Sequence, residues 1–243
     1  MTKEEEFTRI DLFLVKSGYA KSRERAKILI ENGFVFVDGR LIEKPSNKIG
    51  SNSKIDVRGE DIKWVSRAGL KLEHAFNYWD IDVNGSVCVD IGSSTGGFTE
   101  VLLDGGASKI YSVDVGKGQL DKILRDNKKI VVMEETNIKN CVFENIDFIT
   151  TDVSFISIKK IIPNISSFLK SEGEAVLLIK PQFEVGKKFI KRGVVRESDL
   201  HKKVVEDIKS FAFKYNLNTL DVIESPIKGI SGNKEFLAHI KKF

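Results

Sequence analysis

Strand-like and helix-like segments alternate regularly from Ser66 to the end of the chain, and this alternation constrains the fold most strongly. The segment SVCVDIG is a short Val-rich run typical of a buried parallel strand, and GGFTEVLLDGG behind it has the spacing of a helix. Further strands are predicted at KIYSVDV, IVVMEE, DFITTDVS and EAVLLIK, with helices between most of them. Such a series predicts an α/β fold with a doubly wound, Rossmann-like sheet. The last two strand segments, LNTLDVIES and KEFLAHIKKF, predict a terminal antiparallel hairpin.

The first part of the chain, from Phe7 to Arg58, follows a different pattern. It predicts two amphipathic helices and then a small twisted sheet, with Ser22 placed to cap the second helix and Gly33 to end it. Asp38 and Gly39 predict a hairpin turn between two of the strands. The segment carries 11 Lys or Arg against 6 Asp or Glu, whereas the whole chain has a net charge of +4, so this segment is a basic module.

A length of 243 residues suits a small domain followed by a medium-sized one. The stretch GEDIKWV, between the basic module and the alternating segments, predicts a short linker. We therefore expect a small α+β domain over residues 1–60, a linker over 61–65 and the α/β domain over 66–243.

The cysteines and the hydropathy pattern argue against several classes of protein. Cys88 and Cys141 lie in different predicted elements and have no metal-ligand spacing, so we expect both to be structural and no metal to be bound. The first residues, MTKEEEF, are acidic and no signal-peptide apolar region follows them. No apolar run approaches the roughly 20 residues that span a bilayer. We therefore expect a cytoplasmic protein, and the sequence leaves its oligomeric state open.

The strongest single motif is DIGSSTGGF, residues 90–98, which directly follows a buried strand and opens a helix. Glycines at positions 92, 96 and 97 let a ligand approach the backbone closely. The helix N-terminus and the carboxylate of Asp90 favour a ligand that carries both a carboxylate and an ammonium group. The alternative is that these glycines serve only to pack the helix closely against its strand.

Asp114 ends the next strand, about 20 residues beyond the glycines, where an acidic side chain can hold both ribose hydroxyls of an adenosine. A dinucleotide also has such a ribose. However, the motif is not G-x-G-x-x-G, and Asp90 would repel a pyrophosphate but attract the methionine amine of S-adenosylmethionine. We therefore predict S-adenosylmethionine as the cofactor. Its predicted binding residues are Asp90, Gly92, Ser94, Gly96, Gly97, Phe98, Asp114 and Asp152.

Two further polar residues lie where later strands end. Asp152 ends the strand in TTDVSF and Lys180 ends the one in LLIKPQFE, and open α/β sheets place their chemistry at such carboxyl ends. A lysine at the mouth of an apolar strand is partly desolvated, which favours the neutral amine that accepts a proton. Taken alone, each residue is more often part of a salt bridge or a solvated strand end.

The order Lys71, Asp152, Lys180, Glu235 resembles the Lys-Asp-Lys-Glu tetrad of FtsJ-type ribose 2′-O-methyltransferases. Over nearly the whole chain, further strings are similar to the TlyA subfamily: SRAGLKL, DIGSSTGGFTEVLL, DVGKGQL, TDVSFIS, KPQFEVGK, SGNKEF, RIDLFLVKSGYAKSRERA and KPS. This resemblance implies a Rossmann-like methyltransferase sheet preceded by a ribosomal-protein-S4-type RNA-binding domain. It also implies methylation of cytidine 2′-hydroxyls in the ribosomal RNA of one or both subunits.

A tetrad of this kind suits the chemistry of ribose methylation. A ribose hydroxyl is a poor nucleophile near neutral pH, so an amine must accept or steer its proton while the oxygen attacks the sulfonium methyl in line. By motif position, we expect Lys180 to do this. Asp152 and Glu235 would position and tune the lysines by charge, and Lys71 would help to hold the ribose or its phosphate.

Basic side chains on the two predicted amino-terminal helices are expected to contact RNA phosphates, although a solvated helix face is the alternative for any such charge run. A second basic group, in the loop behind Lys180, is expected to guide the RNA backbone into the site or to close over it. The predicted RNA-binding residues are Arg9, Lys16, Ser22, Arg23, Lys27, Arg67, Lys187, Lys188 and Arg192.

Three other functions stay open from the sequence. TlyA relatives have also been labelled haemolysins, and the basic amphipathic stretch ISIKKIIPNISSFLK could favour a membrane-active protein. Pro163 interrupts that stretch and it lies between two predicted buried strands, which favours packing on the sheet. The remaining alternatives are a catalytically inactive RNA-binding ribosome-assembly factor and a methyltransferase that acts on a base or on transfer RNA.

Overall fold

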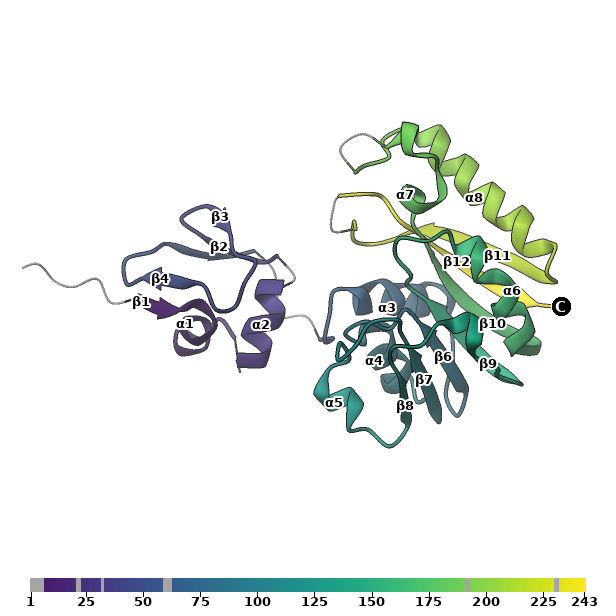
Figure 1. The fold of residues 1–243 in the computed structure, drawn as a ribbon, viewed down its shortest axis with the longest axis horizontal. Coiled ribbons are helices and arrows are strands. Elements are labelled where there is room, and N and C mark those ends of the chain that lie inside the picture. Colours follow the sequence, from purple (N-terminus) through teal and green to yellow (C-terminus); the bar gives the residue numbers. More distant parts are fainter. Residues whose placement is uncertain (1–6, 21–22, 32, 59–62, 191–192, 230–231) are drawn as a thin grey trace, which may run out of the picture. The chain divides into compact units, whose positions relative to one another are not determined.

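A computed structural model of the protein describes residues 7–20, 23–31, 33–58, 63–190, 193–229 and 232–243. The chain divides into two compact units, Met1–Arg67 and Ala68–Phe243, which are shown as ribbons in Figure 1. Each unit has a hydrophobic core of its own.

The first unit contains two helices and two small antiparallel sheets. Its elements are β1 (Phe7–Arg9), α1 (Ile10–Lys16), α2 (Arg23–Glu31), β2 (Val35–Val37), β3 (Arg40–Leu41), β4 (Lys48–Gly50) and β5 (Ile55–Val57). Strand β1 pairs with β4, and β2 lies between β3 and β5. Apolar side chains on one face of each helix, such as Ile10, Leu14 and Leu29, are fully enclosed. The α+β fold expected for this part is confirmed.

The two glycine-containing turns of this unit behave as their sequence predicts. Asp38 and Gly39 have φ angles of 51° and 78° between β2 and β3, which is the left-handed geometry of a tight hairpin. Gly33 has a φ of 73° and its N–H donates to the carbonyl of Ile30, which ends α2. The predicted cap, Ser22, lies outside the described residues.

The second unit is a seven-stranded sheet with helices on both faces. Its strands are β6 (Val87–Ile91), β7 (Lys109–Val113), β8 (Ile130–Met133), β9 (Ile146–Thr151), β10 (Leu169–Ile179), β11 (Leu217–Glu224) and β12 (Phe236–Lys242). Its α-helices are α3 (Ala68–Trp79), α4 (Gly97–Asp104), α5 (Lys122–Arg125), α6 (Ile162–Phe168), α7 (Pro181–Glu184) and α8 (Ser198–Phe213), and its 3₁₀-helices are η1 (Ile138–Asn140), η2 (Ile158–Lys160) and η3 (Lys187–Phe189).

The strand order is β8-β7-β6-β9-β10-β12-β11, in which the first five strands are parallel and the last two are antiparallel to their neighbours. Helices α3 and α4 cover one face of the sheet, and α6 and α8 cover the other (Figure 1). The predicted doubly wound sheet and its terminal hairpin are therefore confirmed.

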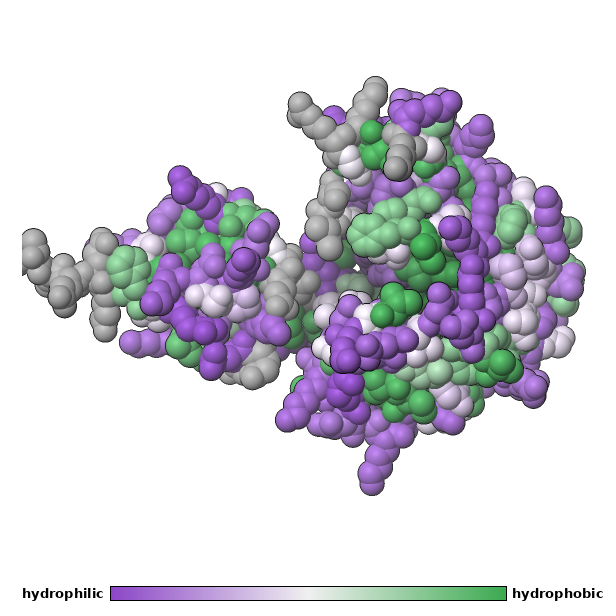
Figure 2. All heavy atoms as spheres, viewed as in Figure 1, coloured by the Kyte–Doolittle hydropathy of each residue, from purple (hydrophilic) through white to green (hydrophobic). Residues whose placement is uncertain are grey.

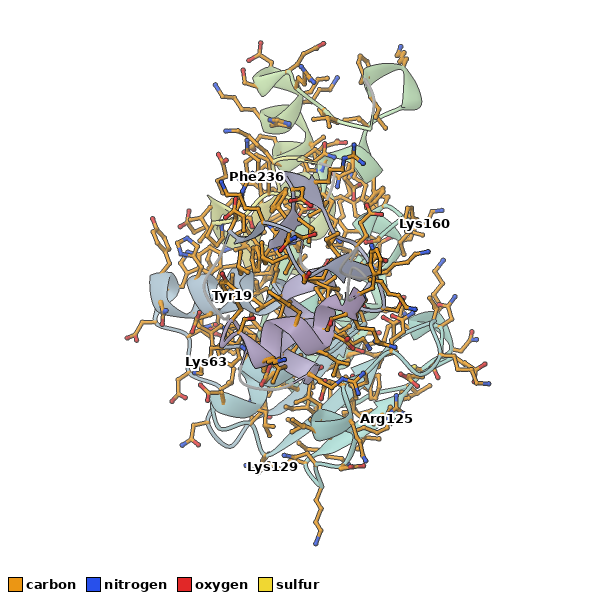
Figure 3. All side chains as sticks on the ribbon, turned by 90° about the vertical axis from the view of Figure 1, so that its left-hand side faces the viewer. Tyr19, Lys63, Arg125, Lys129, Lys160 and Phe236 are labelled. Carbon is orange, nitrogen blue, oxygen red and sulfur yellow. The ribbon has the colours of Figure 1, made fainter. Side chains whose placement is uncertain are left out.

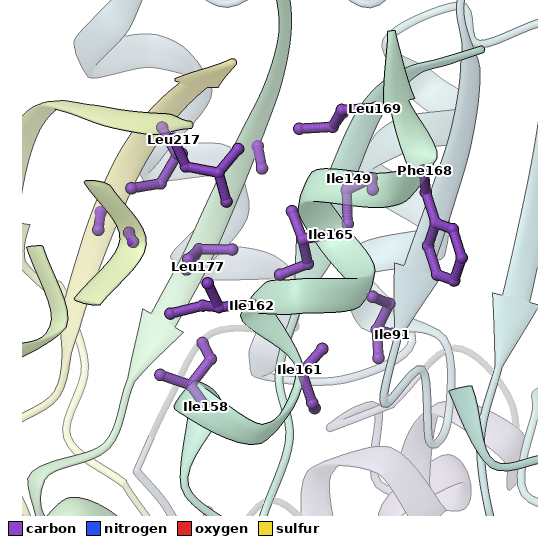
Figure 4. Packing of buried hydrophobic residues seen from close by; sticks show 14 of the residues in the cluster. Ile91, Ile149, Ile158, Ile161, Ile162, Ile165, Phe168, Leu169, Leu177 and Leu217 are labelled. Carbon is purple, nitrogen blue, oxygen red and sulfur yellow. The ribbon is translucent and has the colours of Figure 1, made fainter. Parts of the chain in front are cut away.

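The helix expected over residues 156–170 is shorter than its pattern predicts. The segment forms η2 and then α6, in which Pro163 occupies the first turn, where its missing N–H leaves no helical hydrogen bond unmade. Figure 4 shows apolar side chains of this segment pointing at the central strands. They are Ile158, Ile161, Ile162, Ile165 and Phe168, packed near Ile91, Ile149 and Leu177. The amphipathic stretch considered for membranes therefore covers the sheet.

Hydrophilic residues cover most of the visible face of each unit, and the apolar residues there form separate patches (Figure 2). Basic side chains such as Arg125, Lys129 and Lys160 extend from the surface of the second unit (Figure 3). Among the described residues, we find no helix that is both long enough and apolar enough to cross a membrane.

Candidate active site

The carboxyl ends of β6, β7, β9 and β10 meet at one edge of the sheet. Strand β6 lies between β7 and β9, and open α/β sheets bind their ligands at such a switch in strand order. The glycine-rich loop follows β6, Asp114 follows β7, Asp152 follows β9 and Lys180 follows β10. The topology thus gathers the predicted cofactor motif and two members of the tetrad at one edge.

Asp90, the first residue of the motif, is fully enclosed inside the second unit. Its two carboxylate oxygens accept hydrogen bonds from the hydroxyls of Thr99 on α4, at 2.6 Å, and Thr150 on β9, at 2.9 Å. Burial raises the pKa of this carboxyl to about 7, and the nearby charge of Asp152 acts in the same direction. Asp90 therefore ties three elements together beneath the loop, and its predicted attraction for the cofactor amine stays a prediction.

Gly92 shows why the loop needs glycine. Its φ is +82°, and a Cβ at this position would lie only 2.7 Å from the backbone oxygen of Asp152. The Gly92 N–H donates to the carbonyl of Val113, so the loop is also fixed to β7. Gly96 has a φ of +98°, and a Cβ there would lie 2.3 Å from the Leu124 side chain. Both glycines therefore hold the backbone in places that other residues cannot occupy without strain.

Asp114 lies beside the glycine loop, as expected. Its two oxygens accept hydrogen bonds from the backbone N–H groups of Ser94, at 2.8 Å, and Gly116, at 2.7 Å. Ser94 has a positive φ of 48°, which turns its N–H toward this carboxylate. The acidic residue is thus oriented by the same loop that the predicted cofactor would contact.

Glu134 is a residue of this region that the sequence analysis missed. Its carboxylate follows β8 and accepts backbone hydrogen bonds from Gly118, Gln119 and Leu120. It also pairs with Arg125 at 2.7 Å. These hydrogen bonds, first of all that from Leu120, hold the pKa of Glu134 at about 2. Glu134 therefore fixes the loop of residues 118–120, which follows Asp114. In the sequence, its position directly after a predicted strand was the only sign of this role.

The residues at this edge fit S-adenosylmethionine as the cofactor. The loop offers backbone free of side chains at Gly92 and Gly96, and Gly97 begins a helix whose N-terminus favours a carboxylate. Asp114 stands where an adenosine ribose would present its hydroxyls. Phe98 is only 2% exposed, and its predicted part in cofactor binding stays a prediction.

The four residues of the predicted tetrad form two ion pairs. The Nζ of Lys71, on α3, lies 2.6 Å from Oε2 of Glu235, which immediately precedes β12. The Nζ of Lys180 lies 2.5 Å from Oδ1 of Asp152 and donates to Oγ of Ser154 at 2.8 Å. Three of the four tetrad side chains are at most 10% exposed, and that of Asp152 is 16% exposed. Each lysine is therefore held in place by a carboxylate in a largely water-excluded site.

The strand register brings the two pairs together. Ile179 of β10 pairs with Phe236 of β12, which places Lys180 and Glu235 at the same level of adjacent strands. Gln182, two residues after Lys180, donates from Nε2 to Oε1 of Glu235 at 3.4 Å. Ser154 and Gln182 thus extend the tetrad, and the sequence analysis identified neither of them.

An exposed aromatic residue lies next to these groups. Phe155 follows Ser154, is 87% exposed and has a φ of 65°, a backbone conformation that few non-glycine residues adopt. Its ring lies 5.3 Å from that of Phe183, the residue after Gln182. An aromatic side chain turned into solvent beside buried charges is suited to stack on a planar group. Phe155 is part of the sequence string TDVSF, but only its positive φ and its exposure in the structure indicate a role in binding.

The structure describes the five basic residues predicted to bind RNA in the first unit. Arg9 and Arg23 both form ion pairs with Oδ2 of Asp11 at 2.9 Å, and the bond from Arg9 is the main reason why the pKa of Asp11 falls to about 2. Their side chains nevertheless remain about half exposed. Lys16 and Lys27 are exposed on α1 and α2. The guanidinium of Arg67 lies 5.6 Å from the centre of the Phe34 ring.

The basic loop behind Lys180 is fixed at both of its ends. Near its start, Glu184 accepts hydrogen bonds from Oγ of Ser157 and the N–H of Ile158. Near its end, Asn233 accepts from the N–H of Val195 at 3.0 Å, and the ring of His201 lies 3.1 Å from the carbonyl of Val195. Within the loop, Lys187 belongs to η3, Lys188 is exposed and Arg192 lies outside the described residues.

Comparisons with known proteins agree with this geometry. The model of the FtsJ-like methyltransferase family matches residues 64–242, and the S4 domain model matches residues 8–55. The chain is 37% identical to "16S/23S rRNA (cytidine-2'-O)-methyltransferase TlyA" of Mycobacterium tuberculosis, over 96% of this chain and 89% of that protein. It is 41% identical to "Hemolysin A" of Brachyspira hyodysenteriae, over 95% of this chain and 98% of that protein.

Among solved structures, the chain is similar to one described as "Putative hemolysin from Streptococcus thermophilus". The TM-score is 0.77 and the sequences are 39% identical, over 98% of this chain and 90% of the other. Family model, relatives and structure therefore agree over both units. The chain belongs to the FtsJ-like methyltransferase family, in the TlyA group, and carries an S4 domain before its S-adenosylmethionine-dependent methyltransferase domain.

Proposed function

We propose that this protein transfers a methyl group from S-adenosylmethionine to cytidine 2′-hydroxyls of ribosomal RNA. The observation that carries the proposal is the two enclosed Lys–carboxylate pairs, of which the one with Asp152 lies beside the glycine loop. The name of the Mycobacterium tuberculosis relative supports the cytidine ribose and the RNA of both subunits as substrates.

The bound cofactor would supply an electrophilic methyl group on a sulfonium, and Gly92, Gly96 and Asp114 would hold it. The protein's own part is then to orient the nucleophile and to manage its proton. Lys180 lies in a largely dry site with its Nζ fixed by Asp152 and Ser154, so it can direct one hydrogen-bonding position at a ribose hydroxyl. We assign Lys180 the role of directing the proton of this hydroxyl away from the attacking oxygen.

Lys71 and Glu235 would form the second half of the catalytic group. Their ion pair is enclosed, with side-chain exposures of 9% and 3%, so the attraction between the charges is little screened. A lysine held in this way would orient the ribose or its phosphate through its ammonium hydrogen bonds.

The RNA would be held mainly outside this group. Lys16, Lys27, Lys188 and the half-exposed Arg9 and Arg23 offer charge for phosphates. Exposed Phe155 offers a ring on which the target base could stack once it leaves the RNA helix. Because Arg9 and Arg23 share Asp11, we assign them the positioning of phosphates as a pair.

The domain limits also stay a proposal. We propose an S4-type RNA-binding domain over 1–60, a linker over 61–65 and the methyltransferase domain over 66–243. We also propose that the protein acts in the cytoplasm, because its proposed partners are ribosomal subunits.

The direct test is methyl transfer by the purified full-length protein. Tritium-labelled S-adenosylmethionine is mixed separately with small subunits, large subunits, free ribosomal RNA and transfer RNA, alongside a Lys180→Ala control. We expect label in ribosomal RNA, with loss of at least about a hundredfold in the control, because the variant removes the group that steers the proton. Label in transfer RNA alone would overturn the proposed substrate.

Two of the three other functions that the sequence left open involve no methyl transfer. An inactive assembly factor would bind ribosomal subunits and the cofactor without transferring label, which the same experiment detects. The second is a haemolytic activity, which the name of the Brachyspira hyodysenteriae relative suggests. The stretch considered for membrane contact packs on the sheet instead, with Ile162 and Ile165 fully buried, so ribose methylation is the function that the geometry favours.

A further inference from the structure

Gln182 carries a hydrogen-bond acceptor that no described residue satisfies. Its Oε1 atom is buried and has no hydrogen-bond partner among the residues that the structure describes. Most buried polar atoms in folded proteins find a partner, so an orphan beside a site is a candidate ligand contact. Thr151 Oγ1, at the end of β9, is a second such atom at the same edge of the sheet.

The orientation of the Gln182 amide is fixed by chemistry. Its Nε2 atom donates to Oε1 of Glu235 at 3.4 Å, and the opposite orientation would bring two acceptor oxygens together. Glu235 is itself paired with Lys71 at 2.6 Å, so it stays an acceptor. The free group of Gln182 is therefore an oxygen, which can accept a hydrogen bond but cannot donate one.

The turn that carries Gln182 is well anchored. Helix α7 begins at Pro181, and the N–H of Phe183 donates to the carbonyl of Lys180 at 2.9 Å. At the other end of this helix, Glu184 accepts from Ser157 and Ile158. The orphan oxygen is thus held two residues from the lysine that we assign to the reaction.

The position in the sheet indicates which ligand would supply the donor. Gln182 follows β10 and contacts the residue before β12, whereas the glycine loop and Asp114 follow β6 and β7. Strand β9 separates these two halves. The orphan acceptor therefore lies apart from the glycine loop and Asp114, on the side of the site that the proposed function leaves for the RNA.

The chemistry of RNA narrows the donor further. Phosphate oxygens only accept hydrogen bonds, so a carbonyl oxygen cannot accept one from them, whereas the 2′-hydroxyl is the donor of the sugar-phosphate backbone. The bases carry N–H donors as well, but the ribose hydroxyl is the group that the proposed reaction brings to Lys180, two residues from Gln182. We propose that Oε1 of Gln182 accepts a hydrogen bond from a ribose 2′-hydroxyl of the RNA substrate. The inference rests on the proposed function and adds a substrate-contacting residue to it. The hydroxyl belongs either to the methylated nucleotide or to its neighbour.

Two substitutions separate this role from simple support of Glu235. Gln182→Met keeps the length of the side chain and removes both the donor and the acceptor. Gln182→Lys keeps a donor for Glu235 and removes the acceptor, and it also adds an ammonium group that can pair with Glu235. The assay measures methyl transfer at saturating S-adenosylmethionine while the concentration of the ribosomal subunit varies. Cofactor affinity and melting temperature are measured alongside to show that the variants fold.

We expect both variants to lose roughly tenfold to hundredfold in kcat/KM for RNA, while cofactor affinity stays within about twofold. A fall in kcat assigns the contact to the reacting hydroxyl, and a rise in KM assigns it to the neighbouring one. Transfer by Gln182→Lys within about threefold of the wild type would overturn the proposal, because support of Glu235 would then suffice. Methyl transfer by Gln182→Met at the wild-type rate would overturn it as well. A wild-type protein that labels no RNA would instead refute the proposed function.

Discussion

Removal of Lys71 tests how the buried half of the tetrad is stabilised. Lys71→Met keeps an unbranched side chain of similar length on α3 and removes the charge that pairs with Glu235 at 2.6 Å. The carboxylate of Glu235 is then left 3% exposed, and its remaining described contact is the weak hydrogen bond from Gln182 at 3.4 Å. An enclosed charge without a counter-charge strongly destabilises a fold.

The size of this effect follows from the burial. Breaking a buried ion pair by removing one partner costs about 3–5 kcal/mol. For a unit of this size, each kcal/mol shifts the melting temperature by about 2–4 °C, so Lys71→Met should lower it by about 10 °C. The pair between Lys234 and Glu224 is a matched control, because it joins the same residue types at 3.0 Å but is about half exposed. Lys234→Met should cost at most about 1 kcal/mol.

Calorimetry of the full chain measures both variants, together with Lys71→Met/Glu235→Gln. The double variant removes both charges and should recover much of the lost stability, since no unpaired charge stays enclosed. Equal melting temperatures for the Lys71 and Lys234 variants would refute the reasoning. A double variant no more stable than Lys71→Met alone would do the same.

Three further predictions concern the ligand side of the site and its foundation. Phe155→Ala should lower kcat/KM for RNA at least about tenfold in the transfer assay, with unchanged cofactor affinity, because it removes an exposed stacking ring. Gly92→Ala should weaken cofactor binding at least about tenfold by calorimetric titration, since its Cβ would lie 2.7 Å from the Asp152 backbone oxygen. Asp90 has a pKa raised from 3.8 to about 7, so it retains its proton in the folded state when the unfolded state has lost it. The contribution of Asp90 to stability therefore falls by about 4 kcal/mol between pH 4 and 7, and Asp90→Asn should abolish this part of the pH dependence in urea unfolding.

The general architecture could be predicted from the sequence because it depends on patterns that are repeated and local. Short apolar runs, separated by segments with the periodicity of helices, predicted the parallel strands. Asp38 and Gly39 predicted the hairpin turn of the first unit. The predicted limits of a helix were less accurate where a single residue such as proline restricts the position at which the helix can begin. Pro163 begins the first turn of α6, so one predicted helix became η2 and a seven-residue helix.

The partners of individual side chains could not be predicted, because they depend on contacts between distant segments. The sequence order suggested four tetrad residues, but not that they form two ion pairs or that Lys71 meets a residue 164 positions away. Asp90 was predicted to attract the cofactor amine, which stays a prediction, and the sequence did not indicate that its two oxygens accept hydroxyl hydrogen bonds from Thr99 and Thr150. Gln182 carries no motif of its own, and only its unmatched oxygen distinguishes it.

The identity of the methylated nucleoside tests the central claim most directly. Ribosomal subunits treated with the wild-type protein and with Lys180→Ala are digested to nucleosides and analysed by mass spectrometry against synthetic standards. We expect 2′-O-methylcytidine to increase with the wild-type protein and not with the variant. A methyl group on the cytosine base, or equal amounts of 2′-O-methylcytidine with both proteins, would contradict the account.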